Sequence, residues 1–473
     1  MAYRTENPAT GVVEKEYTSA TDADVTRAIE RADAAFGTWR TTDASERASV
    51  LAKVADIYDE RADELARVIG AEMGKPLAQA QGEVALASSI FRWYSEHGEE
   101  LLVEEQLNIG DDAKSLVVTD PIGVLMGVMP WNFPHYQVAR FVAPNLMLGN
   151  TILLKHASIC ARTAELIEEI LHAAGVPQDA YINLFVSNEQ ITSIIEDPRV
   201  RGVSLTGSEG AGKAVAETAS QNLKKSVLEL GGSDALIVLD DVDVAETAKA
   251  VATARMSNAG QACNSPKRIF VPSTMFDDFV NGVVATVEGM KVGNPDDEGT
   301  DIGPLSSVEA RDDAIAQVER AVEQGATLRT GGTALEQDGA WMAPAVLTGV
   351  TREMDAFKEE IFGPVAVMYK AADEDEAVRI ANDTLFGLGA SVHSSDVDAA
   401  LRVADRLESG MVSINEAPGS SSELPFGGVK RSGFGRELGT YGGHLELSAF
   451  AHLKQKQIRI VQPGLVYVVA CDD

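Results

Sequence analysis

The sequence is poor in lysine and in positive charge overall. Its 473 residues include 40 Lys and Arg against 72 Asp and Glu, so the formal net charge is −32, and only 16 of the basic residues are lysines. A field this negative repels phosphate and argues against a nucleic-acid partner. The carboxylates are spread along the whole chain, which is typical of an acidic surface suited to high salt. An ordinary acidic cytosolic protein is the alternative.

Cysteines and membrane signals are also scarce. The chain has three cysteines, Cys160, Cys263 and Cys471, and this odd number implies no disulfide framework. Its beginning has no apolar run of the signal-peptide type. The segment 121–139 is uncharged, but its prolines, amides and histidine would be costly in a lipid-facing helix, so we interpret it as a buried strand followed by an irregular loop. We therefore expect a soluble cytoplasmic protein without a membrane partner.

Apolar residues, at 45 % of the chain, are ample for sizeable cores, and their spacing predicts an α/β protein. Helical periodicity covers 43–71, where Asp43 and Glu46 suggest a capping box, and 77–100. Strand-like runs then alternate with helical segments up to residue 239, which predicts a doubly wound parallel sheet. A second α/β unit follows residue 264, and a β-branched strand is expected over 456–470.

A glycine-rich segment, 207–213, follows a predicted strand and opens a helix. Backbone N–H groups at such a helix start attract phosphate. The segment nearly matches the phosphate-loop pattern, but Ala214 stands where a hydroxyl would hold magnesium. A phosphate-bearing cofactor therefore fits better than a nucleotide hydrolase, while glycines that merely permit a tight turn remain the structural alternative.

Three further segments carry side chains suited to chemistry. Cys263 lies between a predicted helix and a strand, although most single cysteines are buried small hydrophobes. Glu229 is followed by Gly231 and Gly232, so backbone can approach a ligand there. Prolines on both sides of Asn132 fix its loop, and a preorganised amide N–H is what an oxyanion requires.

Together these segments resemble the aldehyde dehydrogenase superfamily over essentially the whole chain. The motifs that carry the resemblance occur in order at 130–134, 154–155, 205–208, 229–232, 260–263, 359–364 and 425–428. Seven motifs in sequence are far more specific than any one of them. Details around Lys155, Asp234 and Arg436 are most similar to the short prokaryotic type of succinate-semialdehyde dehydrogenase.

The resemblance implies a fold and a division of the chain. The expected fold is α/β, with a variant Rossmann cofactor domain at 1–107 and 128–230, and an α/β catalytic domain at 231–430. A small β extension at 108–127 and 450–473 would serve oligomerisation, giving a homodimer or homotetramer. No metal is implied.

The resemblance also assigns catalytic roles. Cys263 is the expected nucleophile that adds to the aldehyde carbon, and the Asn132 amide with the Cys263 backbone N–H would hold the oxyanion. Glu229 would be the general base for hydrolysis of the thioester. Relatives that pass the acyl group to coenzyme A typically lack this base, so hydrolysis to the free acid is favoured.

For the cofactor, the resemblance places Lys155 at the adenosine ribose, Ser208 at the pyrophosphate and Glu360 at the nicotinamide ribose. The other expected cofactor contacts are Trp131, Gly207 and Phe362. Ser158 stands where NAD-preferring relatives often carry Glu, which removes a charge that would repel a 2′-phosphate. NADP is therefore the expected cofactor, with NAD also usable.

The expected substrate is succinate semialdehyde. Arg140 matches a position where semialdehyde-oxidising relatives bind the distal carboxylate, and Ser421 would assist it; an ordinary salt bridge is the alternative for Arg140. Glu423 and Ser257 depart from the pattern, because related enzymes tend to have basic residues there. A carboxylate at Glu423 would oppose a carboxylated substrate, so 2-oxoglutarate semialdehyde or a neutral aliphatic aldehyde remains an alternative.

Overall fold

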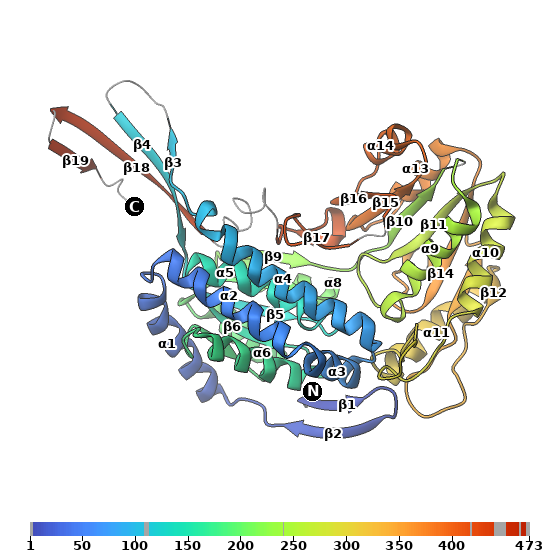
Figure 1. Ribbon diagram of the computed structural model, residues 1–473, viewed down its shortest axis with the longest axis horizontal. Helices are drawn as coiled ribbons and strands as arrows, with labels where there is room; N and C mark the ends of the chain where they lie inside the picture. Colours follow the sequence, from blue (N-terminus) through green and yellow to red (C-terminus); the bar gives the residue numbers. More distant parts are fainter. Residues whose placement is uncertain are drawn as a thin grey trace.

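The computed structural model describes residues 3–107, 113–239, 241–416, 419–438, 451–462 and 465–469. Among these residues, two α/β lobes lie side by side, and a β-arm projects from the first lobe (Figure 1). A hairpin of β1 (Tyr3–Asn7) and β2 (Val12–Tyr17) lies along the outside of the first lobe. The doubly wound α/β fold predicted from the sequence is confirmed.

The first lobe is built on a six-stranded sheet that is parallel except at one edge. Its spatial order is β17 (Gly433–Phe434), β9 (Lys225–Glu229), β8 (Val200–Thr206), β5 (Val124–Met129), β6 (Thr151–His156) and β7 (Tyr181–Asn183). Every residue of β5 is buried, as expected of a strand whose two faces are both covered by helices.

Two groups of helices cover this sheet. One core packs α2 (Ala44–Glu60), α3 (Ala62–Met73), α4 (Leu77–Leu101), α5 (Tyr136–Leu148) and α6 (Ala161–Ala174). The other face carries α1 (Asp22–Trp39), α7 (Asn188–Glu196) and α8 (Glu209–Gln221). Among the described residues, no helix has both the length and the apolar character needed to cross a membrane.

The second lobe repeats this layering on a seven-stranded sheet. Its order is β12 (Thr327–Thr330), β13 (Ala345–Thr348), β14 (Val365–Ala371), β11 (Pro266–Pro272), β10 (Asp234–Val238), β15 (Gly389–His393) and β16 (Met411–Ile414). One core holds α9 (Val244–Met256) and α10 (Phe276–Glu288). The opposite core holds α11 (Val308–Glu323), α12 (Asp355–Lys358), α13 (Glu374–Asn382) and α14 (Val397–Ala404).

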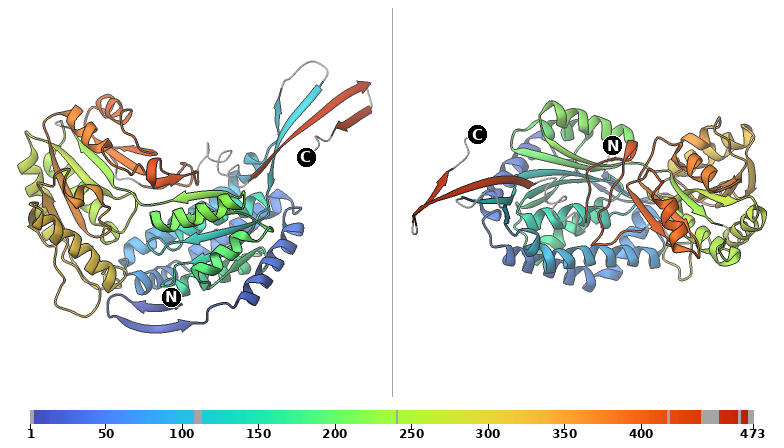
Figure 2. Two further views of the ribbon diagram at one scale, coloured as in Figure 1. Left: turned by 180° about the vertical axis from the view of Figure 1, so that it is seen from behind. Right: turned by 90° about the horizontal axis from the view of Figure 1, so that it is seen from above.

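The arm joins segments from the middle and the end of the chain, as both views in Figure 2 show. Strand β4 (Ala113–Pro121) pairs antiparallel with β18 (Ala451–Gln462), and β3 (Glu105–Leu107) and β19 (Leu465–Val469) complete the sheet. The expected single strand over 456–470 is therefore a hairpin. The end of the expected extension, 108–127, belongs instead to β5, which begins at Val124; residues 108–112 lie outside the described ranges.

Two local predictions need correction. The helix expected over 43–71 is interrupted at Arg61, where the backbone leaves the helical region, and becomes α2 and α3. Asp43 precedes α2 but its side chain makes no capping hydrogen bond. Complete capping boxes occur instead at the starts of α1 and α7, at Thr21 and Ser187.

A buried ion pair fixes the loop between β5 and α5. Lys75, between α3 and α4, pairs with Glu83 of α4, and both side chains are excluded from solvent. Lys75 Nζ also donates to the Asn132 carbonyl oxygen at 2.9 Å. Glu83 Oε1 accepts from the backbone N–H groups of His135 at 2.8 Å and Tyr136 at 3.2 Å, at the start of α5. The pair therefore holds this loop at Asn132 and at its junction with α5.

Because a buried charge without its partner is strongly destabilising, we expect Lys75→Met and Glu83→Gln each to lower the free energy of unfolding by about 3–5 kcal/mol. The double variant should recover part of that loss, since it leaves no unpaired charge. Urea titration measures all three. Lys15→Met, which breaks the exposed pair with Glu165, is the control and should change stability by less than about 1 kcal/mol. Single variants as stable as the parent would show that the pair does not hold the loop.

Candidate active site

A cavity of about 340 Å³ lies where the two lobes meet. Segments that follow β5, β8 and β9 in the first lobe supply one wall, and the segments before β11 and β14 in the second supply the other. The described residues that line it are Pro130, Trp131, Asn132, Gln137, Thr206, Gly207, Ser208, Glu209, Leu230, Gly231, Cys263, Glu360, Phe362 and Phe386. The carboxyl edge of a parallel sheet is where such folds bind ligands.

Cys263 lies in an irregular segment between α9 and β11. After α9 a short turn follows in which Asn258 and Ala259 have φ values of 53° and 52°, so the chain reverses sharply before the cysteine. Burial raises the pKa of the Cys263 thiol to about 12, and the positive charges of Lys267 and Arg140 oppose that shift. The thiol is therefore a free cysteine on the cavity wall that its surroundings hold mainly in the protonated form.

Asn132 joins its own loop to the cysteine segment. Its side-chain Nδ2 donates to the Gln261 carbonyl oxygen at 3.1 Å, and its backbone carbonyl accepts from Asn258 Nδ2 at 2.9 Å. An amide nitrogen carries two hydrogens, so this bond leaves a second N–H for another acceptor. The amide is thus preorganised beside Cys263 on the cavity wall.

Glu229 ends β9 and is buried; it precedes Leu230 of the cavity wall and pairs in register with Thr206, another residue of that wall. Neither of its carboxylate oxygens has a hydrogen-bond partner among the described residues. Burial raises the pKa of Glu229 well above its ordinary value, the nearby Arg140 lowers it, and Glu437 raises it further. An unpartnered buried carboxyl with a raised pKa is suited to taking up a proton.

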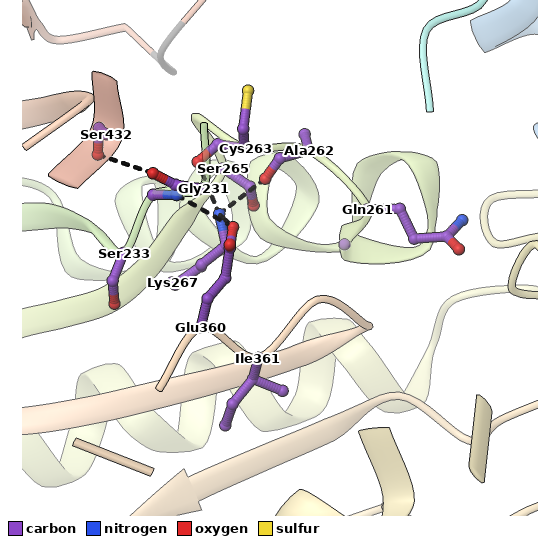
Figure 3. Close-up of polar contacts among 12 residues, drawn as sticks. Gly231, Ser233, Gln261, Ala262, Cys263, Ser265, Lys267, Glu360, Ile361 and Ser432 are labelled. Atoms are coloured by element: carbon purple, nitrogen blue, oxygen red, sulfur yellow. Dashed lines mark hydrogen bonds and ion pairs between the residues drawn. The ribbon is translucent and has the colours of Figure 1, made fainter. Parts of the chain in front are cut away.

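Glu360 lies in the loop before β14 and lines the cavity. Two groups of the protein interior hold its carboxylate. Its Oε1 accepts from the Gly232 backbone N–H at 3.2 Å and pairs with Lys267 Nζ at 3.2 Å (Figure 3). A Cβ on Gly231 would lie 2.3 Å from Glu360 Oε2, and one on Gly232 would lie 2.5 Å from the Cys263 carbonyl oxygen. The two glycines after Glu229 are therefore required by close packing.

Sequence reasoning missed Arg255, a fully buried residue of α9. Its guanidinium donates to carbonyl oxygens of Gly260 at 3.0 Å, Ile361 at 3.0 Å and Gly363 at 2.7 Å, and burial lowers its pKa to about 9. Arg255 thus joins the cysteine segment to the loop of Glu360. An arginine in the last turn of a helix is ordinarily exposed, so only its partners reveal this role.

Lys267, in β11, was not predicted from the sequence either. The available signal was a pair of basic residues, Lys267 and Arg268, inside a short apolar strand; both are buried.

The expected cofactor residues fall into two groups. Trp131, Gly207, Ser208, Glu360 and Phe362 line the cavity, and the rings of Trp131 and Phe362 meet edge to face with centroids 5.8 Å apart. Ser208 caps α8, with its hydroxyl accepting from the Ala211 N–H at 3.3 Å. The N-terminus of α8 therefore opens beside the cavity and suits a phosphate.

Lys155 and Ser158 lie farther along the same sheet edge, at and after the end of β6. Lys155 pairs in register with Val128 of β5, immediately before the Asn132 loop. Burial lowers the pKa of Lys155. The Ser158 carbonyl accepts from the Arg4 N–H at 3.1 Å, which anchors the backbone there. No group of His, Cys, Asp or Glu able to hold a metal occurs within the part of the chain that the structure describes.

The expected substrate residues are not on the cavity wall. Arg140 is fully buried: its guanidinium pairs with Glu437 and donates to the Tyr136 hydroxyl at 3.2 Å and to Thr206 Oγ1 at 3.0 Å. Arg140 pairs with Glu437 and does not line the cavity, which favours the salt-bridge alternative over a substrate contact; the substrate contact stays a prediction.

Ser421 is likewise engaged elsewhere, since its hydroxyl donates to Glu423. Glu423 is exposed and does not line the cavity, so its charge does not oppose a carboxylated substrate there. The neighbouring Ser420 shares a hydrogen bond of 2.7 Å with the Tyr136 hydroxyl.

Comparisons with known proteins agree with this geometry. The model of the aldehyde dehydrogenase family matches residues 1–449. The succinate-semialdehyde dehydrogenase [NADP(+)] of Deinococcus radiodurans is 50 % identical over 440 residues, covering 93 % of this chain and 92 % of that protein. Its counterpart in Mycobacterium avium is 43 % identical over 457 residues, covering 96 % of each.

A solved structure shares the whole architecture. The succinic semialdehyde dehydrogenase from Streptococcus pyogenes, in complex with NADP+, superimposes with a TM-score of 0.93 at 40 % identity, over 96 % of this chain and 99 % of that one. The resemblance noted in the sequence is thus confirmed: the chain belongs to the aldehyde dehydrogenase family.

Proposed function

We propose that this protein oxidises succinate semialdehyde to succinate with NADP+, through a thioester on Cys263. The observation that carries the proposal is the convergence of Cys263, the Asn132 amide and Glu360 on one cavity, with the unpartnered Glu229 carboxyl beside its wall. The names of relatives at 43–50 % identity supply the substrate and the cofactor.

The chain's own residues account for the chemistry as follows. The Cys263 sulfur bonds to the aldehyde carbon, and the developing oxyanion accepts from the free N–H of Asn132 and from the Cys263 backbone N–H. When the C=O bond re-forms from the oxyanion, the C–H bond breaks, hydride leaves and a thioester remains on Cys263; NADP+, when bound, would supply the acceptor for that hydride. Glu229 then takes a proton from water, the water oxygen bonds to the thioester carbon, and the Cys263 thiolate leaves.

The residues present fit NADP+. The apolar cradle of Trp131 and Phe362 suits a nicotinamide ring, the N-terminus of α8 at Ser208 suits the pyrophosphate, and Glu360 suits ribose hydroxyls. Lys155 and Ser158 are placed farther along the same edge, where the adenosine end would lie, and present no carboxylate to a 2′-phosphate.

The remaining alternatives concern the substrate. Another small aldehyde, such as 2-oxoglutarate semialdehyde, would use the same catalytic residues. Because Arg140 is buried, residues of the cavity wall would distinguish between these substrates. The phosphate-loop alternative has no support, because Lys213 is exposed and pairs with Glu209 at 2.6 Å. We also retain as proposals the homodimer or homotetramer, the cytoplasmic location and the tolerance of high salt.

Removal of the nucleophile tests the function directly. We expect Cys263→Ala to lower kcat for aldehyde oxidation at least about 1000-fold, with NADP+ affinity unchanged, because the covalent step is lost and the binding residues stay. Initial rates with succinate semialdehyde, 2-oxoglutarate semialdehyde and propanal, with each cofactor, measure the effect and the preference.

Cys160→Ala is the matched control for this variant, because Cys160 is a buried cysteine at the start of α6 that does not line the cavity; its Sγ lies 3.9 Å from a backbone atom, the Trp131 carbonyl oxygen. It should retain the parent's rate. Turnover by Cys263→Ala would overturn the proposed chemistry, whereas preference for another aldehyde would change only the substrate.

The pH profile follows from the two raised pKa values. Cys263 reacts as thiolate and Glu229 as carboxylate, and burial raises the pKa of both, so each reactive form gains population as pH increases. We expect kcat/KM to rise between about pH 6 and pH 9, approaching tenfold per unit where one deprotonation limits the rate. A flat profile over that range would show that both groups are already ionised at neutral pH.

Cofactor choice is tested at Ser158. We expect Ser158→Glu to lower kcat/KM for NADP+ about tenfold or more while that for NAD+ changes little, because the new carboxylate would repel the 2′-phosphate. Ser158→Gln, of the same size without the charge, separates charge from bulk. Equal losses for both cofactors in Ser158→Glu would show that residue 158 lies away from the 2′ position.

A further inference from the structure

We propose that Lys267 is a positioning residue of this active site: its ammonium holds the Cys263 segment against Glu360 and supplies positive charge that favours the Cys263 thiolate. The inference rests on the proposed roles of Cys263 and Glu360. It goes beyond them by naming the group that couples the nucleophile to the cofactor-binding carboxylate.

Three oxygen atoms surround the ammonium of Lys267. The residue stands in β11, near its amino end, and is buried. Nζ donates to the carbonyl oxygens of Ala262 and Cys263, each at 2.7 Å, and forms an ion pair with Glu360 Oε1 at 3.2 Å. Two hydrogen bonds and one ion pair therefore hold this buried charge.

These contacts reach both halves of the site. The two carbonyl oxygens belong to the irregular segment before β11, outside the ladder of the sheet. The Ala262 carbonyl also accepts from the Ser265 N–H at 3.2 Å. Because a charged donor bonds more strongly than a neutral one, Lys267 strengthens the hold on this turn and fixes the Cys263 carbonyl beside it. Figure 3 shows the Cys263 sulfur on the side opposite Lys267. The hydrogen bond from Lys267 to the Cys263 carbonyl oxygen therefore leaves the thiol facing the cavity.

Charge adds a second effect. The charged groups that act on Cys263 are Lys267 and Arg140, which lower the pKa of the thiol, and Glu360 and Asp234, which raise it. Arg140 is already paired with Glu437. Without Lys267, the thiol would therefore face two carboxylates and one neutralised arginine, and its ionisation would be less favourable.

The geometry favours lysine over arginine. The three acceptors surround a single nitrogen, which a compact ammonium matches, whereas a guanidinium presents planar, divergent donors. Arginine would keep the positive charge but would not donate to the two carbonyl oxygens with the same geometry. The two variants Lys267→Met and Lys267→Arg therefore separate the charge from the positioning.

The experiment measures the reaction of Cys263 with iodoacetamide as a function of pH, followed by mass spectrometry of the Cys263 peptide in the intact enzyme without cofactor. The affinity for NADP+ is measured in parallel by fluorescence titration. Neither readout needs an aldehyde, so both remain valid if the proposed substrate or oxidation fails.

The matched control is Lys430→Met. Lys430 also donates to two carbonyl oxygens, of Asn382 at 3.0 Å and Thr384 at 3.4 Å, and pairs with Glu408 at 2.7 Å, but it lies away from the cavity. Its loss removes the same kinds of contact without touching the site, so the alkylation profile and NADP+ affinity should match the parent's.

For Lys267→Met we expect alkylation at neutral pH to be about tenfold slower and its midpoint to move up by about one pH unit, because a favourable charge is removed. NADP+ binding should weaken as Glu360 loses its partner. Lys267→Arg should keep the alkylation midpoint yet still weaken NADP+ binding.

Where Lys267→Met does not fold, Lys267→Gln takes its place with the same expected results. A purely structural role would lower thermal stability and leave the alkylation midpoint and the NADP+ affinity at the parent's values. That result in either variant would overturn the proposal.

Discussion

The site depends on one constraint: loops buried between two lobes carry carbonyl oxygens that no helix or sheet satisfies. Buried cations meet this need. Lys75 holds the Asn132 carbonyl, Arg255 holds Gly260 and Gly363, and Lys267 holds Ala262 and Cys263. Each cation lies in a helix or strand or directly next to one. The sheets and helices therefore fix the positions of these loops. Two of the 16 lysines of the chain, Lys75 and Lys267, have this role.

The same burial sets the protonation of the two groups proposed to carry the chemistry. Burial raises the pKa of both the Cys263 thiol and the Glu229 carboxyl, so their ionised forms are disfavoured. Nearby cations oppose this shift in each case. Exposed groups at the same positions would have lost this control, because solvent screens their charges.

Arg140, where a substrate contact was expected, takes part in a buried ion pair. It is neutralised by Glu437 and bonded to Tyr136 and Thr206, so its charge stabilises the contact between α5, β8 and the segment after β17. An arginine at the expected spacing thus contributes to packing, because a carboxylate from a distant part of the sequence lies beside it.

The sequence by itself determined the family and the alternation of strands and helices, and it predicted Cys263, Asn132, Glu229 and Glu360 as site residues, because these follow from local motifs and from close packing that only certain residues permit. Gly231 and Gly232 are examples, since any side chain would strike Glu360 or the Cys263 carbonyl. The tertiary structure alone decided the partners of the buried charges. Arg140 meets Glu437, 297 positions away, and Lys267 of β11 meets Glu360, which lies just before the neighbouring strand β14. No periodicity or spacing encodes such pairings, because they arise only when segments distant in the sequence fold together.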